Sequence, residues 1–166
     1  MIMWFAENLG VLNEKRCKMT TDWILRVGDG KNFIRSSKYR IWGINTLTSP
    51  HGKNFVKNVK PGDRLWFVTS KSHGKIEAVV TFQSYNTREF GSLIDISLTN
   101  EELGWTGSGL SNVEVHYTDL YGLNDCELLT QIRCPTTIRK YDEKCRINLA
   151  VEYSYIVRYR RVIFEL

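Results

Sequence analysis

The sequence lacks the usual signatures of metal sites and membrane spans. Its 166 residues include four cysteines, and none of them forms a CxxC pair or lies at ligand spacing from a histidine: Cys17, Cys126, Cys134 and Cys145. A zinc site is therefore not expected. Apolar runs such as Ala78–Val80 are far shorter than the ~20 residues of a spanning helix. Residues 1–16 contain no continuous apolar segment, so no secretory signal is expected and we interpret the cysteines as free intracellular thiols.

Catalytic motifs are also missing. His51, His73 and His116 belong to no HExxH motif, and the sequence has no GxSxG motif and no Walker-type phosphate loop. The adjacent Glu101 and Glu102 would point apart, so they predict no acid–base pair. We therefore expect a protein that is not an enzyme and that needs no cofactor and no metal.

What the sequence does contain is aromatic residues and positive charge. Aromatics make up 12% of the chain, hydrophobic residues 42% and charged residues 25%, with a net charge of +5 and a pI near 9.0. Rings in this number can fill a small barrel or stack on bases. The charge fits a polyanionic partner, although many soluble domains without one are equally basic. The length fits one domain, which we place at residues 22–166, preceded by an N-terminal extension at residues 1–21.

Short β-rich segments dominate this domain. Period-two patterns and β-branched residues predict strands at Trp23–Val27, Tyr39–Ile44, Arg64–Thr69, Lys75–Phe82 and Val113–Tyr117, with weaker or longer extended patterns at Leu128–Cys134 and Arg146–Phe164. Arg64–Thr69 is apolar on both faces and is expected to be central. It should form a hairpin with the strand that follows.

The connecting segments carry turn and helix signals. Lys31–Lys38 is expected to be a short helix capped by Asp29, and Lys53–Val59 a turn of helix. Lys60–Asp63 is a tight turn, because proline fixes φ at one central position and glycine accepts a positive φ at the next. The segments 45–52 and 83–112 are interpreted as loops. The fold class is therefore α+β and mainly β, a small barrel with a few short flanking helices.

Within residues 23–82 the sequence resembles a known family. Four segments of the chain resemble the EVE domain family, which belongs to the PUA-like superfamily: WILRVG, YRIWGI, HGKNFVKNVKPGDRLWFV and GKIEAVVTF. The run from Arg26 to Trp42, and KYRIW especially, also resembles the related YTH domains. The coupling of IWG to VKPGD at this spacing is the most specific part of the likeness. The resemblance implies a PUA-like barrel that binds nucleic acid and holds a modified base in an aromatic pocket.

The resemblance assigns roles to particular residues. Trp42 matches the tryptophan that walls the pocket in the relatives, and Asn32 matches a position that contacts the base in YTH domains. Gly28 replaces an asparagine of YTH domains, which favours modified cytosine, the base type associated with EVE domains, over N6-methyladenine. From the residues themselves, Gly43 beside Trp42 suggests a slot for a flat group. We complete the candidate pocket with Asn45 and with Trp105, a loop tryptophan flanked by glycines. Anchoring of this loop onto the core is the alternative role for Trp105.

Positive side chains surround Trp42 in the sequence. The candidate phosphate-binding residues are Arg26, Lys31, Arg35, Lys38, Lys53, Lys57 and Lys60. A base held in a pocket must be unstacked, so the expected partner is RNA or DNA that is single-stranded or has a flipped base, with no membrane involved. Three alternatives stay open: a Trp42 that belongs to the barrel core, an enzyme for modified nucleotides on the same fold, and a protein-interaction module. The sequence leaves the oligomeric state undecided.

Overall fold

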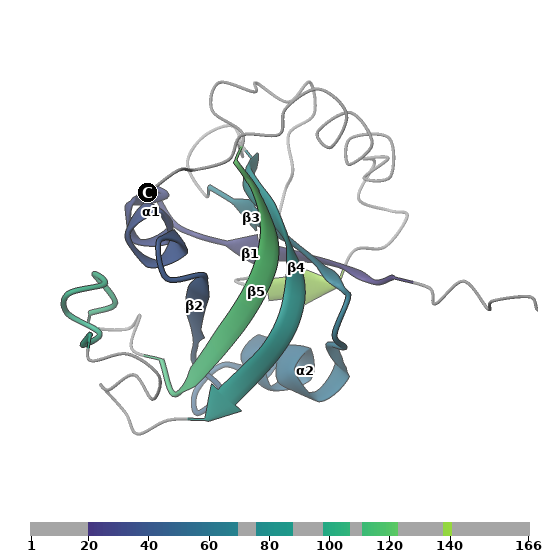
Figure 1. Ribbon diagram of the computed structural model, residues 1–166. Coiled ribbons are helices and arrows are strands. Elements are labelled where there is room, and N and C mark those ends of the chain that lie inside the picture. Colours follow the sequence, from purple (N-terminus) through teal and green to yellow (C-terminus); the bar gives the residue numbers. More distant parts are fainter. Residues whose placement is uncertain (1–19, 70–75, 88–97, 107–110, 123–137, 141–166) are drawn as a thin grey trace, which may run out of the picture.

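The protein folds around one curled sheet (Figure 1). A computed structural model describes residues 20–69, 76–87, 98–106, 111–122 and 138–140. These contain the strands β1 (Asp22–Arg26), β2 (Ile41–Ile44), β3 (Arg64–Val68), β4 (Ile76–Thr87), β5 (Val113–Gly122) and β6 (Ile138–Lys140), and the helices α1 (Lys31–Ser37) and α2 (Pro50–Asn58). The sheet curls into half a barrel. The expected mainly β fold with short flanking helices is confirmed.

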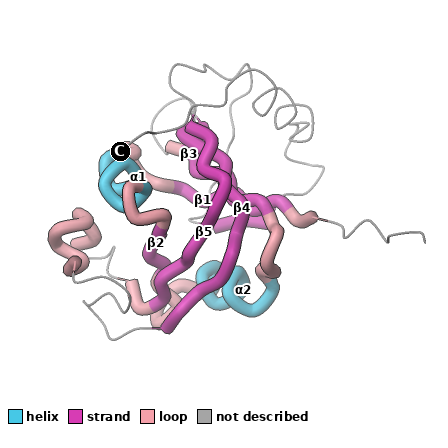
Figure 2. The backbone as a smooth tube through the Cα atoms, viewed as in Figure 1, coloured by secondary structure: helices cyan, strands magenta, loops and turns pink. Residues whose placement is uncertain are grey.

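The strand order is β2-β5-β4-β3-β1-β6. β1 runs parallel to β3, and every other neighbouring pair is antiparallel. Figure 2 shows the two long strands β4 and β5 bending together across the sheet, and register shifts in their ladder accompany this bend. β3 lies between β4 and β1, so its predicted central position and its hairpin with β4 are confirmed.

One hydrophobic core joins the sheet to both helices. Val113, Val115 and Tyr117 of β5 face this core as predicted and are 1%, 0% and 1% exposed, although Glu114 between them is buried too. Phe33 of α1 and Phe55 of α2 belong to the same buried cluster. The two helices lie at separate ends of the sheet, with α1 at the upper left and α2 at the lower right of Figure 1. Side chains on α1 and on α2 therefore belong to different parts of the surface.

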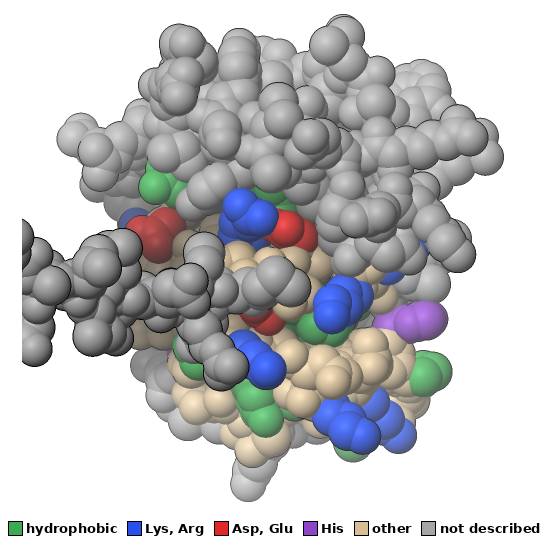
Figure 3. Space-filling view, turned by 90° about the vertical axis from the view of Figure 1, so that its right-hand side faces the viewer, with side chains coloured by type: hydrophobic (Ala, Val, Ile, Leu, Met, Phe, Trp, Pro, Cys, Tyr) green, Lys and Arg blue, Asp and Glu red, His purple; other side chains and the backbone are tan. Residues whose placement is uncertain are grey.

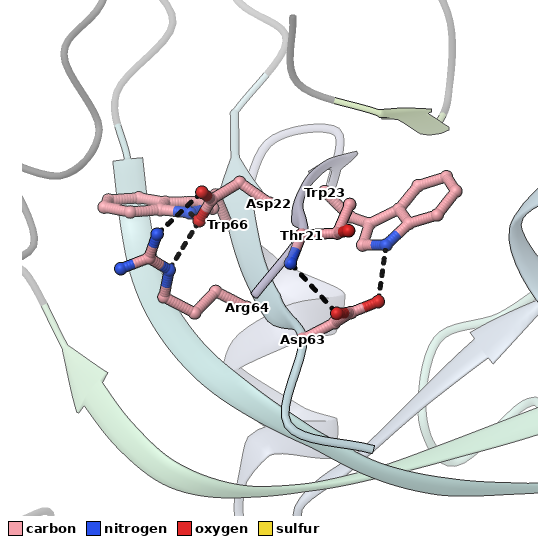
Figure 4. Close-up of polar contacts among 6 residues, drawn as sticks. All are labelled: Thr21, Asp22, Trp23, Asp63, Arg64 and Trp66. Atoms are coloured by element: carbon pink, nitrogen blue, oxygen red, sulfur yellow. Dashed lines mark hydrogen bonds and ion pairs between the residues drawn. The ribbon is translucent and has the colours of Figure 1, made fainter. Parts of the chain in front are cut away.

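Two aspartates hold β1 to β3 (Figure 4). Asp63 is buried and accepts hydrogen bonds from the Thr21 and Lys60 N–H groups, at 3.0 and 2.9 Å, and from the Trp23 indole at 3.2 Å. Asp22 accepts from Arg64 Nε at 2.6 Å, from a second Arg64 nitrogen at 2.7 Å, and from the Trp66 indole at 2.8 Å. Each carboxylate thus accepts hydrogen bonds from donors that the packing of β1 on β3 would otherwise leave buried without an acceptor.

The turn that presents Asp63 has the predicted chemistry. The Asp63 N–H donates to the Lys60 carbonyl at 2.9 Å, and Gly62 adopts a φ of 95°. A side chain is disfavoured at that φ, so glycine suits the position.

Several boundaries differ from the expectation: β5, for example, runs to Gly122 and not to Tyr117. Gly30, not Asp29, is the N-cap of α1, although the Asp29 carboxylate accepts from the first helical N–H at 3.1 Å. α2 begins at Pro50, inside the segment interpreted as a loop, because Ser49 caps it and proline suits a first helical turn. β4 continues to Thr87 because its polar residues 83–87 pair with β5, which replaces the first part of the expected loop 83–112.

Several expectations fall on residues outside the described ranges. These are the four cysteines, the extended patterns at 128–134 and 146–164, and nearly all of the N-terminal extension. In the ranges that are described, neither helix is long and apolar enough to cross a membrane, and no group of three metal-ligating side chains comes together.

Candidate functional site

Trp42 lies on β2, at one end of the strand order, and is partly exposed. Three rings contact it, with centroid distances of 6.2 Å to Phe33, 5.7 Å to Phe67 and 5.8 Å to Trp105. The interplanar angles are 61°, 67° and 79°, so none of these three rings stacks flat on the indole. Trp42 packs against the core on one side and retains contact with solvent, which is the condition that a stacking platform requires.

Trp105 lies beside Trp42, as expected of a second pocket wall, but it is buried at 3% exposure. Two walls that sandwich a base must lie parallel and about 7 Å apart, twice the ~3.4 Å rise of stacked bases. The Trp105 ring is perpendicular to Trp42 and its centroid is 5.8 Å away. In this arrangement no base fits between the two indoles. Of the two residues, only Trp42 is partly exposed.

Gly43 explains why Trp105 is buried. A Cβ on Gly43 would lie 2.9 Å from Trp105 Cε3 and would also overlap Ser111. The sequence suggested that this glycine makes a slot for a flat group. The flat group against it is the indole of Trp105, which packs with Ile41 and Leu103 in a small second cluster.

Asn32 ties α1 to the Trp105 loop. Its Nδ2 donates to the Gly104 carbonyl at 2.8 Å. Gly104 has a φ of 76°, and a Cβ there would overlap the Asn32 side chain and approach Arg35 Nη1 at 2.9 Å. The amide therefore contributes to the position of the neighbouring Trp105, while its predicted contact to a base stays a prediction.

Asn45 orders the loop that follows β2. Its Oδ1 accepts from the Leu47 and Thr48 N–H groups at 2.9 and 3.0 Å. Asn112 fixes the same loop by bonding both the N–H and the hydroxyl of Thr46, at 2.7 and 2.8 Å. The Asn45 oxygen thus acts within its own turn, three residues beyond Trp42.

The candidate phosphate-binding residues divide into two groups. Lys31, Arg35 and Lys38 lie on or just after α1, whereas Lys53, Lys57 and Lys60 lie on or just after α2. All six are exposed, and so is Arg26 at the end of β1. α1 contacts β2, the strand of Trp42, whereas α2 contacts β6 at the other end of the strand order, so the two groups belong to different parts of the surface (Figure 1). Figure 3 shows the right-hand side of Figure 1, where Lys and Arg side chains stand at separate points of the surface.

Sequence reasoning missed a buried acidic residue near the site. Glu114 is 0% exposed and its Oε1 lies 2.8 Å from His116 Nε2. In the register of β2 and β5, Glu114 pairs with Gly43, the residue against which Trp105 packs. Strict alternation with Val113 and Val115 would leave Glu114 exposed. Its burial depends on contacts distant in sequence, so no local pattern predicts it.

The curled sheet and its two helices define the class: this is the fold of the YTH domains. The Pho92 YTH domain, solved in complex with m6A, is similar at 12% identity and a TM-score of 0.53, over 84% of this chain and 85% of that one. The Mmi1 YTH domain is similar at 14% identity and a TM-score of 0.50, over 82% and 91%. No family model and no curated protein matches the sequence. At these identities the likeness establishes the shared fold alone.

Proposed function

We propose that this protein is a nucleic-acid reader that holds one base, carrying a chemical modification, against the indole of Trp42. The observation that carries the proposal is the partial exposure of Trp42 within an aromatic cluster on a YTH-like fold. An exposed indole supplies about 1–3 kcal/mol of stacking per base. The proposed activity is intracellular and consists of binding and release without chemical change.

Single-stranded RNA is the proposed partner. The Pho92 YTH domain was solved with m6A, which makes N6-methyladenine a candidate base. Modified cytosine is the other candidate, because of the sequence resemblance to EVE domains. DNA with a flipped base is a less favoured partner, since flipping costs a few kcal/mol that a single strand does not require.

A substitution at Trp42 tests the proposal. Trp42→Leu keeps an apolar side chain against Phe33 and Phe67 but removes the flat surface. Wild type and variant are titrated with single-stranded RNAs of one sequence, carrying a central N6-methyladenosine, 5-methylcytidine or no modification. We expect the variant to bind the preferred RNA about 5- to 100-fold more weakly and to lose its preference over the plain RNA.

Tyr85→Leu is the matched control. Tyr85 lies on β4 and is 40% exposed. One strand, β5, separates it from Trp42, because both residues pair with Val115, and its ring is not one of the three packed against Trp42. Its binding and thermal unfolding should equal those of the wild type. A Trp42→Leu protein that is folded and still discriminates the modified RNA would contradict the proposal.

A further inference from the structure

The surface that runs from α1 to the start of β2 combines positive charge with exposed apolar groups. Ile34 is 60% exposed and Tyr39 is 46% exposed, both unusually high for large apolar side chains. Lys31, Arg35 and Lys38 are exposed around them. An aromatic ring among cations is the combination that binds single-stranded nucleic acid, with stacking on the ring and ion pairing to the phosphates.

Most of this charge is not neutralised within the described residues. Lys31 lies 3.6 Å from Asp29, but none of the described acidic side chains forms an ion pair with Arg35, Lys38 or Arg40. Burial raises the pKa of the Tyr117 hydroxyl more than the positive charge of Arg40 lowers it, so the phenol stays neutral and supplies no counter-charge.

The backbone at Arg40 points to a role for its side chain. Arg40 has a φ of 54°, in the left-handed region. Asp119 is the other described non-glycine residue with a positive φ, and aspartate tolerates that region better than arginine does. Glycine would avoid the strain of this conformation at position 40. A long cationic side chain at a strained position, next to the exposed Tyr39, is typical of a binding site.

This surface adjoins the candidate site. Phe33 of α1 contacts Trp42, and Arg35 reaches the Gly104 turn that precedes Trp105. Tyr39 precedes Trp42 by three residues, which span at most about 11 Å. Nucleotides in a stacked strand advance by about 3.4 Å each, so the Tyr39 ring is within reach of a base a few positions from one held at Trp42.

We propose that this surface binds the nucleotides that flank the base held at Trp42, with Tyr39 stacking on a neighbouring base and Lys38 and Arg40 contacting phosphates. The inference rests on the proposed function and adds the path of the strand, which runs along α1 and not along α2. Stacking and phosphate contacts carry little sequence information. This surface therefore raises affinity for modified and plain RNA alike.

The test measures binding of two unmodified single-stranded RNAs, three and nine nucleotides long, at low salt. Tyr39→Leu should weaken binding of the nine-nucleotide RNA about 5-fold or more and leave the short RNA unaffected. Tyr39→Phe retains a ring and should restore wild-type affinity. Tyr85→Leu, at a similarly exposed tyrosine on β4, should change neither RNA.

Arg40→Gly separates binding from stability. Because glycine accepts the φ of 54°, the variant should be at least as stable as the wild type in denaturant. It should nevertheless bind the longer RNA more weakly, and the salt slope of binding should fall by about 0.7 for one lost phosphate contact. Lys140→Gln, at an exposed lysine of β6, is the control that should retain the slope.

Two results would overturn the inference in different ways. If Tyr39→Leu and Arg40→Gly bind the longer RNA as tightly as the wild type while Trp42→Leu loses its preference for modified RNA, the α1 path is wrong and the reader function stands. If the wild type binds neither RNA but binds an acidic peptide such as polyglutamate, both the path and the reader function are wrong.

Discussion

The tryptophans at the centre of the sheet and those near its edge differ in what fixes them. Trp23 and Trp66 are 1% and 0% exposed, and the indole N–H of each donates to an aspartate. Trp42 and Trp105 meet each other near the edge strand β2, and Trp42 keeps a partly exposed ring. A tryptophan whose ring and nitrogen are both satisfied inside the protein serves the scaffold.

The largest loss of stability is expected from a substitution of Asp63, between β1 and β3. Asp63→Ala would leave three donors, the Thr21 and Lys60 N–H groups and the Trp23 indole, without their acceptor. We expect the free energy of unfolding to fall by about 3 kcal/mol or more, measured by urea denaturation. Asp63→Asn keeps an acceptor oxygen and should lose less. Equal stability of Asp63→Ala and wild type would show that the aspartate does not hold β1 to β3.

A smaller effect is expected beside Trp105. Gly104→Ala combines an unfavourable φ of 76° with overlap against Asn32 and Arg35, whereas Gly62→Ala has a φ of 95° and no atom within 4 Å of the new Cβ. In both variants the positive φ should lower the free energy of unfolding by about 1–2 kcal/mol. The free energy of unfolding of Gly104→Ala should fall by about 1–3 kcal/mol more, because the new Cβ also overpacks against its neighbours. Urea denaturation of the two variants compares them directly. Equal losses would mean that the loop moves aside without resistance.

The smallest effect is expected at Asn32. Asn32→Ala removes the hydrogen bond to the Gly104 carbonyl and should cost about 1 kcal/mol of stability. If the amide only positions the Trp105 loop, Asn32→Ala should lose no more affinity for RNA than Gly104→Ala loses. A loss of affinity well beyond that in Gly104→Ala, in a folded protein, would assign Asn32 a direct contact with the base. Titration with RNA alongside thermal unfolding distinguishes the two.

Local chemistry accounts for what the sequence predicted. Val113, Val115 and Tyr117 alternate along β5 and are all buried, and the Pro61-Gly62 turn leads into β3. The start of α2 at Pro50 was also within reach of local rules, because Ser49 and Pro50 form a recognisable helix start.

The candidate site was only partly predictable because its contacts are distant in sequence. Trp42 and Trp105 come together, but nothing local indicates that Gly43 leaves room for Trp105, or that Asn32 bonds Gly104 from another element. Glu114 is likewise buried between Val113 and Val115, which the alternating pattern of β5 does not predict. Such pairings are set by tertiary packing, which overrides local patterns.

The position of β1 has a consequence for synthesis on the ribosome. β1 pairs on one side with β3 and on the other with β6, where Leu25 lies opposite Ile138. During translation β3 emerges soon after β1, but β6 emerges only after β4 and β5. Until then, one backbone edge of the nascent β1 lacks its native neighbour, and such edges promote pairing with other chains. Ribosomal pausing before residue 138 would therefore prolong the interval in which this protein is most prone to aggregate.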